Sequence, residues 1–329
     1  MPYTKTTSTF KSSDGEHNIS YSIYTPTSPA IAIVQIIHGM CEFFDRYHEF
    51  AEYLCEKGVI VCGSDHLGHG ASISDTDDYG FFGRENGARH LVDDVEELRS
   101  IMRKRFRALP YFMLGHSMGS FILRSYIVTY KNTIDGAIIS GTSGGEQPLK
   151  AAKMLASLII RLKGERHRSK LLKKLSMGSY NDRFKSENDS ISWLSRNIDS
   201  RKAYMEDERC TFNFTARGYY DLFTLLQDIS DESWAPEVPR GLPILILNGL
   251  NDPVGNYGSG PQLVADRLQD CELYELSMRN YPEMRHEVLN EIGREQVYDD
   301  IYEWILRIRE GYLEDRLGLP VYFSAEEYR

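Results

Sequence analysis

A serine between two glycines is the first candidate for chemistry in this sequence. Ser117 lies in the stretch G-H-S-M-G, directly after an apolar run that begins at Tyr111. The residues that follow, MGSFILRSYIVTYK, have a helical pattern without a breaker. A serine on a sharp turn between a strand and a helix is typical of an exposed nucleophile. Glycines on either side avoid collisions in so tight a turn. We therefore predict that Ser117 is a nucleophile, with Gly115 and Gly119 as elbow glycines.

The same spacing occurs a second time, so the motif alone is weak. Ser143 lies between Gly141 and Gly145, also after a candidate strand. Gly144 and Pro148 delay any helix there, which favours a loop over a strand-to-helix turn. Ser117 is the better candidate.

A serine hydroxyl needs a base that takes its proton. In hydrolases with such an elbow, the partners follow in the order Ser, Asp or Glu, His. Only His167 and His286 come after Ser117. His167 lies in the charged run KGERHRSK, which is typical of solvated side chains. His286 lies in a loop between the last expected strand and the final helix, and we predict that it is the base.

The acid of such a site stands at the end of the preceding strand, where it orients the imidazole. In LPILILNGLNDPVG, Asp252 comes just after a strongly apolar run, in a turn that Asp-Pro also favours. Asp266 and Asp270 fall on or after the next helix and are poorer candidates. We predict that Asp252 is the acid.

The oxyanion of an acyl-transfer reaction needs two backbone N–H donors. One is expected from Met118, the residue after the nucleophile, and the other from a loop after an early strand. In QIIHGMCEF, Gly39 lets the backbone turn and Met40 follows it. Met40 and Met118 are therefore the predicted oxyanion donors.

The segment SDHLGHGAS contains residue types that can bind a metal ion. Asp65, His66 and His69 have ligand chemistry, but they lie on a glycine-rich turn, and no further histidine or cysteine cluster completes a coordination shell. Cys41 lies beside the predicted oxyanion loop, and we expect it to be an ordinary buried cysteine and not a reactive thiol. We expect neither a metal nor another cofactor.

The bulk properties exclude several classes of protein. A formal net charge of -10 disfavours nucleic acid as a partner. The N-terminus lacks the apolar core of a secretory signal, and no apolar run approaches the roughly 20 residues of a membrane-spanning helix. Five scattered cysteines without C-x-x-C spacing favour reduced thiols. We therefore expect a cytoplasmic protein.

Buried strands alternate with helices over most of the chain. Apolar runs at 30–37, 59–65, 111–117, 135–140, 242–249 and 271–277 predict strands, after a β-hairpin arm at 18–26, and residues 87–108, 118–131 and 295–312 predict helices. This order predicts an α/β fold with a mostly parallel sheet covered on both faces. No strand is expected between the runs at 135–140 and 242–249. This gap divides the chain into three predicted parts: core residues 1–144, a mainly helical cap inserted at 145–235, and core residues 236–329 with a C-terminal tail from Gly311.

Several segments together resemble the monoacylglycerol lipase and lysophospholipase-like group of α/β-hydrolases, the serine aminopeptidase S33-like hydrolases. The similar segments are HGMCEFFDRY, SDHLGHGAS, LGHSMGS, NGLNDPVG and RHEVLNE, in this order. The resemblance implies an α/β-hydrolase fold, a triad of Ser117, Asp252 and His286, oxyanion N–H groups from Met40 and Met118, and a structural turn at residues 66–70. Cys41 to Phe44 and Ser120 depart from the group's usual residues.

The inserted segment is the expected source of selectivity. Residues 149–175 hold nine Lys or Arg residues against one Glu. Five apolar residues could form one helical face: Met154, Leu155, Leu158, Ile159 and Leu162. Such a segment either lies on an anionic lipid surface, covers an acyl chain, or packs on the core.

The predicted function is hydrolysis of lipid-like monoesters, with a small-molecule ester that carries an acyl chain as the partner. A small-ester carboxylesterase, an S33-type aminopeptidase and a non-catalytic binding module are the alternatives. The oxyanion loop lacks the HGGPG pattern that is expected of a proline aminopeptidase. An intact set of triad and oxyanion residues is more than a binding module needs.

Overall fold

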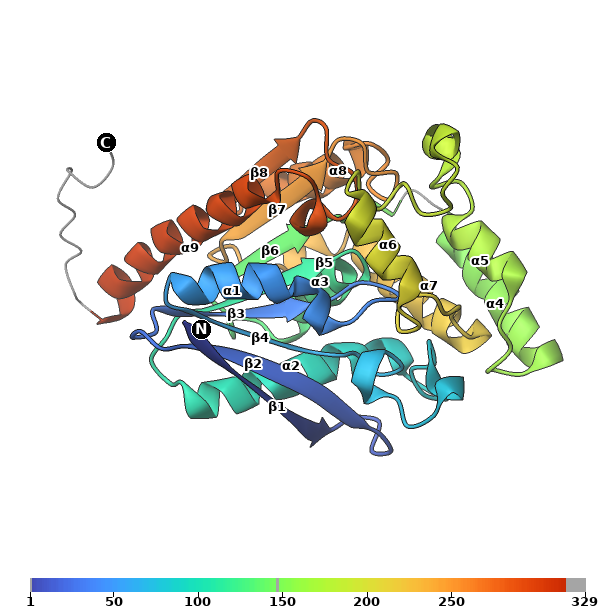
Figure 1. Ribbon diagram of the computed structural model, residues 1–329, viewed down its shortest axis with the longest axis horizontal. Coiled ribbons are helices and arrows are strands. Elements are labelled where there is room, and N and C mark those ends of the chain that lie inside the picture. Colours follow the sequence, from blue (N-terminus) through green and yellow to red (C-terminus); the bar gives the residue numbers. More distant parts are fainter. Residues whose placement is uncertain (1, 146–147, 318–329) are drawn as a thin grey trace.

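A computed structural model describes the backbone of residues 2–145 and 148–317, with side chains as far as Gly311. Within this part, eight strands form one sheet flanked by helices (Figure 1). The strands are β1 (Tyr3–Lys11), β2 (Asn18–Pro26), β3 (Ala32–Ile37), β4 (Val59–Ser64), β5 (Tyr111–His116), β6 (Gly136–Ser140), β7 (Ile244–Gly249) and β8 (Leu276–Tyr281). The helices are α1 (His48–Glu56), α2 (Gly87–Arg105), α3 (Met118–Thr129), α4 (Leu149–Lys163), α5 (Lys170–Met177), α6 (Ile198–Glu206), α7 (Ala216–Ser230), α8 (Ser259–Asp270) and α9 (Arg294–Leu317).

The sheet has the order β1-β2-β4-β3-β5-β6-β7-β8. The predicted hairpin arm is confirmed: β1 pairs antiparallel with β2, from Tyr3 opposite Pro26 to Lys11 opposite Asn18. Strands β3 to β8 run parallel. All their carboxyl ends therefore meet at one edge of the sheet. The direction of winding reverses between β3 and β5, and such switch points are where α/β sheets place their sites.

Both faces of strands β3 to β7 are buried, as the apolar runs predict. In β3, Ile33 and Ile37 pack into the cluster that contains α2, α3 and α8. Val34 and Ile36 point to the other face, into the cluster with α1 and α9. Because neighbouring residues of a strand face opposite sides, a strand covered on both faces must be apolar throughout. This explains the continuous apolar runs.

Two element boundaries differ from the predictions. The strand expected at 271–277 is β8, which spans Leu276–Tyr281 and ends opposite Gly249 of β7. As an edge strand, β8 carries polar residues, so its pattern is weaker than that of the preceding turn. The expected tail begins later too, because α9 continues through Leu317, past Gly311. The rest of that tail, 318–329, lies outside the described residues.

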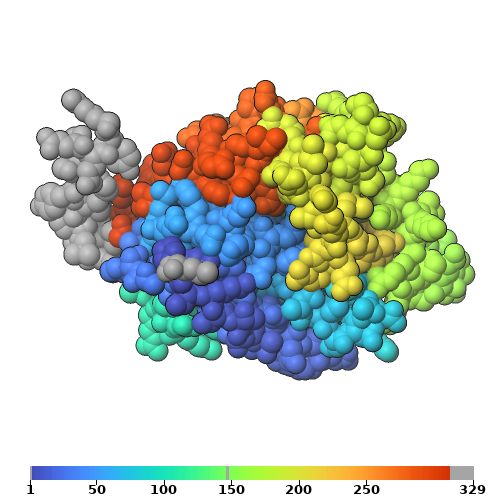
Figure 2. Space-filling view, in the orientation of Figure 1, coloured from blue at the N-terminus to red at the C-terminus, as the bar shows by residue number. Residues whose placement is uncertain are grey.

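The helices α4 to α7 lie between β6 and β7, and we call residues 149–230 the helical insertion. In Figure 2 it forms a lobe, coloured green to yellow, at one end of the molecule. None of its described residues is in a strand. The predicted domain limits at residues 145 and 235 stay a prediction, and residues 146–147 lie outside the described part.

Arg124 of α3 binds the chain shortly before the helical insertion and again near the insertion's end. Its guanidinium donates to the carbonyl of Ser143 at 2.8 Å and to that of Ile229 at 2.7 Å. The indole of Trp234 donates to the Arg124 carbonyl at 2.9 Å and lies under the guanidinium. Burial lowers the pKa of Arg124 to about 9. The insertion is thus anchored to the helix that follows Ser117.

Within the described residues, no helix combines the length and apolar character that a bilayer crossing requires.

Candidate active site

Ser117 lies on a strained turn between β5 and α3. Its backbone has φ 53° and ψ -120°, a conformation that a side chain rarely adopts. The turn is held by the Ser117 N–H, which donates to the Ser140 carbonyl at 2.9 Å, and by the Ser120 N–H, which donates to the Ser117 carbonyl at 2.8 Å. Helix α3 begins at the next residue. The structure therefore has the strand-to-helix turn that the sequence predicts.

The two glycines beside this turn leave no room for a side chain. A Cβ atom on Gly119 would lie 1.9 Å from the Ile37 carbonyl oxygen, and one on Gly115 would lie 2.4 Å from the Gly119 carbonyl oxygen. Both positions therefore need glycine for close backbone approach.

The structure brings Ser117, His286 and Asp252 into one hydrogen-bonded chain. The distance from His286 Nε2 to Ser117 Oγ is 2.8 Å, and that from His286 Nδ1 to Asp252 Oδ2 is also 2.8 Å. Asp252 is fully buried after β7, and its Oδ1 accepts from the Val254 N–H at 2.8 Å. In the sequence, His286 is 169 positions from Ser117 and 34 positions from Asp252. They meet because β5, β7 and β8 end at the same edge of the sheet.

The electrostatics of His286 reflect two opposing causes. Burial disfavours the imidazolium and would lower the pKa of His286, but the Asp252 carboxylate favours it, and the net effect raises the pKa. The ring packs between His116, at 4.7 Å between ring centroids, and Trp193 of the helical insertion, at 5.1 Å. These rings limit where the imidazole can turn.

The loop after β3 reaches Ser117. A Cβ atom on Gly39 would lie 3.1 Å from the Ser117 Cβ. The Gly39 N–H donates to Glu42, and the Cys41 N–H donates to His69 Nε2 at 3.3 Å. Between them, the Met40 N–H donates to no acceptor among the described residues, and the same holds for the Met118 N–H. Both predicted oxyanion donors are therefore free for a substrate.

A buried ion cluster beside this loop was not foreseen. Arg46 donates to Glu42 at 2.8 Å and to both carboxylate oxygens of Glu287 at 2.7 Å. Burial raises the pKa of Glu42, although Arg46 opposes the rise. In Glu287 the Arg46 charge outweighs burial and lowers the pKa. The cluster joins the loop after β3 to the loop of His286. The segments HGMCEFFDRY and RHEVLNE contain its members, but their spacing alone does not show that they pair.

The histidines of SDHLGHGAS form a structural turn. The His66 N–H donates to His38 Nε2 at 2.9 Å, and His66 Nε2 lies 3.0 Å from the His38 carbonyl. Burial lowers the pKa of His66 to about 4 and that of His69 to about 3. The Asp65 carboxylate accepts backbone N–H groups, from Ala71 at 2.7 Å and from Phe44 at 2.9 Å. In the described part of the chain, no group of three or more His, Cys, Asp or Glu residues is arranged to hold a metal ion.

The other candidates lie apart from the hydrogen-bonded chain. Ser143 borders the pocket, but its hydroxyl accepts from the Gly145 N–H at 3.2 Å. His167 lies in the helical insertion, outside the pocket lining. Asp266 and Asp270 are exposed on α8.

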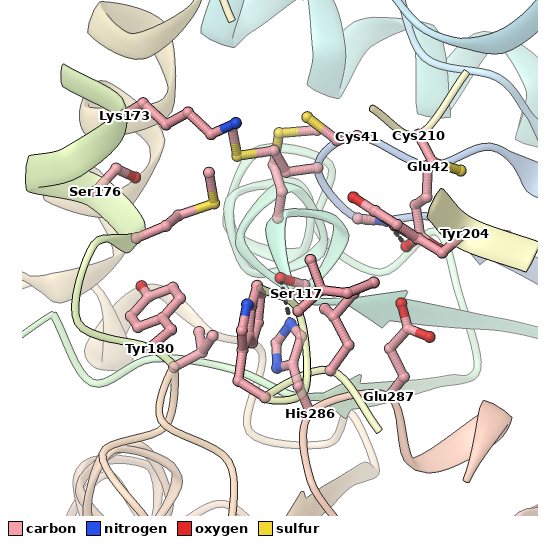
Figure 3. A pocket seen from close by; sticks show the side chains of 18 of the residues that line it. Cys41, Glu42, Ser117, Lys173, Ser176, Tyr180, Tyr204, Cys210, His286 and Glu287 are labelled. Carbon is pink, nitrogen blue, oxygen red and sulfur yellow. Dashed lines mark hydrogen bonds between the residues drawn. The ribbon is translucent and has the colours of Figure 1, made fainter. Parts of the chain in front are cut away.

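Ser117 opens into a pocket of about 470 Å³ between the sheet edge and the helical insertion (Figure 3). This volume lies in the range of small-molecule binding sites, about 300–1,000 Å³. Much of the wall is apolar. The apolar residues that line it include Met40, Met118, Phe121, Met177, Ile191, Trp193, Leu194, Met205, Phe212, Leu222, Leu226 and Val254.

The fold and this site define the protein as an α/β-hydrolase. The family model described as "Serine aminopeptidase, S33" matches residues 28–293, and the chain belongs to this family. A monoacylglycerol lipase of Mycolicibacterium smegmatis is 27% identical over 299 residues, 89% of this chain and 94% of the relative. A phospholipase of Bacillus subtilis is 25% identical over 269 residues, 82% of this chain and 92% of the relative.

A solved structure supports the same assignment. The thermostable carboxyl esterase of Bacillus coagulans, in complex with glycerol, has a TM-score of 0.88 and 30% identity to this chain. The match covers 93% of this chain and 99% of the esterase. The protein is therefore an ester-hydrolysing enzyme with the α/β-hydrolase fold.

Proposed function

We propose that the protein is a serine carboxylic-ester hydrolase that cleaves lipid-like monoesters, such as a monoacylglycerol or a lysophospholipid, through an acyl-enzyme on Ser117. The observation that carries the proposal is the hydrogen-bonded chain from Asp252 through His286 to Ser117, which opens into an apolar pocket. The cytoplasmic location stays a prediction.

The chemistry follows from these positions. His286 Nε2 takes the proton of Ser117 as the hydroxyl oxygen attacks the ester carbonyl, and Asp252 stabilises the imidazolium that forms. The N–H groups of Met40 and Met118 donate to the oxyanion. His286 then protonates the leaving alcohol, and water releases the fatty acid by the reverse sequence of proton transfers. Positioned acid–base catalysis of this kind contributes about 10²–10⁴ in rate.

An aminopeptidase reaction is disfavoured by the charges of the pocket. An aminopeptidase must hold the ammonium group of its substrate, which calls for an available carboxylate. Glu42 and Glu287 are the carboxylates among the described lining residues, and both are bound by Arg46. The family assignment likewise favours an enzyme over a non-catalytic binding module.

A substrate panel tests the proposed function. We expect steady-state hydrolysis of 1-monooleoylglycerol or 1-oleoyl lysophosphatidylcholine, measured by release of oleate. Activity confined to short p-nitrophenyl esters would replace the lipid substrate by a small ester. No hydrolysis of any of these esters would contradict the proposal.

We further propose that the helical insertion acts as a cap that contacts anionic lipid surfaces. Only part of the expected apolar face packs on the core, namely Leu155 and Ile159. The buried side of α4 is instead built from Leu149, Ala152 and Ala156. Met154, Leu158 and Leu162 form an exposed stripe at i, i+4 and i+8, with 74%, 52% and 71% of their surface accessible. Lysine and arginine side chains flank it, so an anionic bilayer is the complementary surface.

Leu158→Glu tests this contact. The substitution places a negative charge on the stripe, so we expect binding to vesicles of anionic phospholipid to fall at least tenfold in a sedimentation assay. Tyr274→Glu is the matched control, since Tyr274 is 79% exposed and precedes β8, at the opposite end of the sheet. Equal vesicle binding by wild type and Leu158→Glu would contradict the contact.

A further inference from the structure

Helix α5 brings three lysines to the rim of the pocket. Lys170, Lys173 and Lys174 all line it, although they belong to a helix whose apolar side packs inward through Leu172. In Figure 3 the side chain of Lys173 extends from α5 into the pocket, toward Cys41. Burial raises the pKa of the Cys41 thiol. The positive charge of the Lys173 ammonium lies near enough to oppose this rise.

These lysines are without a counter-ion in the described residues. None of the three side-chain ammonium groups forms an ion pair or hydrogen bond with a described residue. The charged residues that line the pocket are these lysines, His286, Glu42 and Glu287. Since Arg46 binds both carboxylates, the pocket offers positive charge for which the described residues supply no anion.

We propose that Lys173 binds the phosphate of an anionic head group and thereby makes the enzyme prefer acylated glycerol phosphates over neutral monoacylglycerols. The inference rests on the proposed function, because it assigns the head group of the same ester. A phosphate monoester carries a charge of about -1.5 to -2 at pH 7 and offers several acceptor oxygens. An ammonium on a flexible stem is a suitable partner for such a group. Lys170 and Lys174, on the same rim, add to the positive potential.

The competing explanation is that these lysines only attract the protein to anionic membranes. The two explanations separate when no membrane is present. Octanoyl esters of glycerol and of glycerol 3-phosphate are soluble monomers at low concentration, and they share the acyl chain and the scissile bond. A preference between them therefore reports the head group alone.

The experiment compares kcat/KM for these two esters in wild type and variants, below the concentration at which either forms micelles. We expect wild type to prefer the phosphate ester. Lys173→Ala is expected to lower the ratio of the two kcat/KM values about tenfold, the usual effect of one lost hydrogen bond to a charged group. The change should appear in KM, and Lys173→Arg should restore most of the ratio. Lys202→Ala removes the same charge from the exposed surface of α6 and is expected to leave the ratio as it is.

The outcomes distinguish this inference from the proposed function. If wild type hydrolyses octanoylglycerol but does not prefer the phosphate ester, the inference is wrong and the proposed function stands. The inference is also overturned if Lys173→Ala lowers both kcat/KM values equally, since Lys173 would then act through structure. No hydrolysis of either ester would overturn the proposed function and the inference with it.

Discussion

Replacing Ser117 by alanine is expected to lower kcat on monooleoylglycerol by about 10⁶-fold, as removal of a triad serine does when no other group can replace the nucleophile. The fold should be retained, because alanine keeps the Cβ atom and loses only the hydroxyl that accepts from or donates to His286. The measurement is steady-state kinetics, with circular dichroism and thermal unfolding to establish that the variant is folded. A fluorophosphonate probe should add its mass to wild type and not to Ser117→Ala.

Ser143→Ala is the matched control for this substitution. Ser143 has the same glycine spacing and also borders the pocket, but the ring nitrogens of His286 are hydrogen-bonded to Asp252 and Ser117 instead. We expect this variant to keep its activity within about tenfold and to react with the probe. If Ser143→Ala abolished labelling while Ser117→Ala did not, the nucleophile would be assigned to the wrong serine.

The residues of the hydrogen-bonded chain could be predicted because their positions follow from the order of elements. Ser117 comes directly after β5 and Asp252 shortly after β7, and the carboxyl ends of parallel strands meet at one edge. His286 was found by elimination, since only one other histidine follows Ser117. Local pattern and chain order were sufficient here, because β5 and β7 are buried along their whole length and are followed by turn residues.

The Arg46 cluster could not be predicted in the same way. Arg46 and Glu287 are 241 positions apart, and neither adjoins a feature that predicts their contact. A charged residue in a sequence is read as exposed, and it becomes buried only when tertiary packing supplies the opposite charge. The buried side of α4 could not be predicted from the sequence either. It uses Ala152 and Ala156, where α7 packs on α4, and such small residues do not stand out by hydrophobicity.

The second large effect is expected from Asp252→Asn, which should lower kcat about 10⁴-fold through the tautomer of His286. The Val254 N–H needs an acceptor at Oδ1, so the amide oxygen of asparagine stays there and its NH₂ group faces His286 Nδ1. The imidazole must then accept at Nδ1 and carry its proton on Nε2, where it cannot take the proton of Ser117. Asp266→Asn, an exposed change on α8, is the control and should keep full activity.

The dependence of kcat/KM on pH distinguishes a changed protonation of His286 in Asp252→Asn from a simple loss of folding. His286 must be neutral to act as a base, so activity falls as the pH drops through its pKa. In wild type the Asp252 carboxylate raises this pKa above the ordinary value of about 6.5, despite burial, and the acid limb of kcat/KM should have its midpoint above 6.5. Without that carboxylate the effect of burial is opposed less, so the midpoint for Asp252→Asn should move to lower pH than in wild type. A loss of activity with an unmoved midpoint would mean that Asp252 does not control the protonation of His286, and the proposed role of Asp252 would then be wrong.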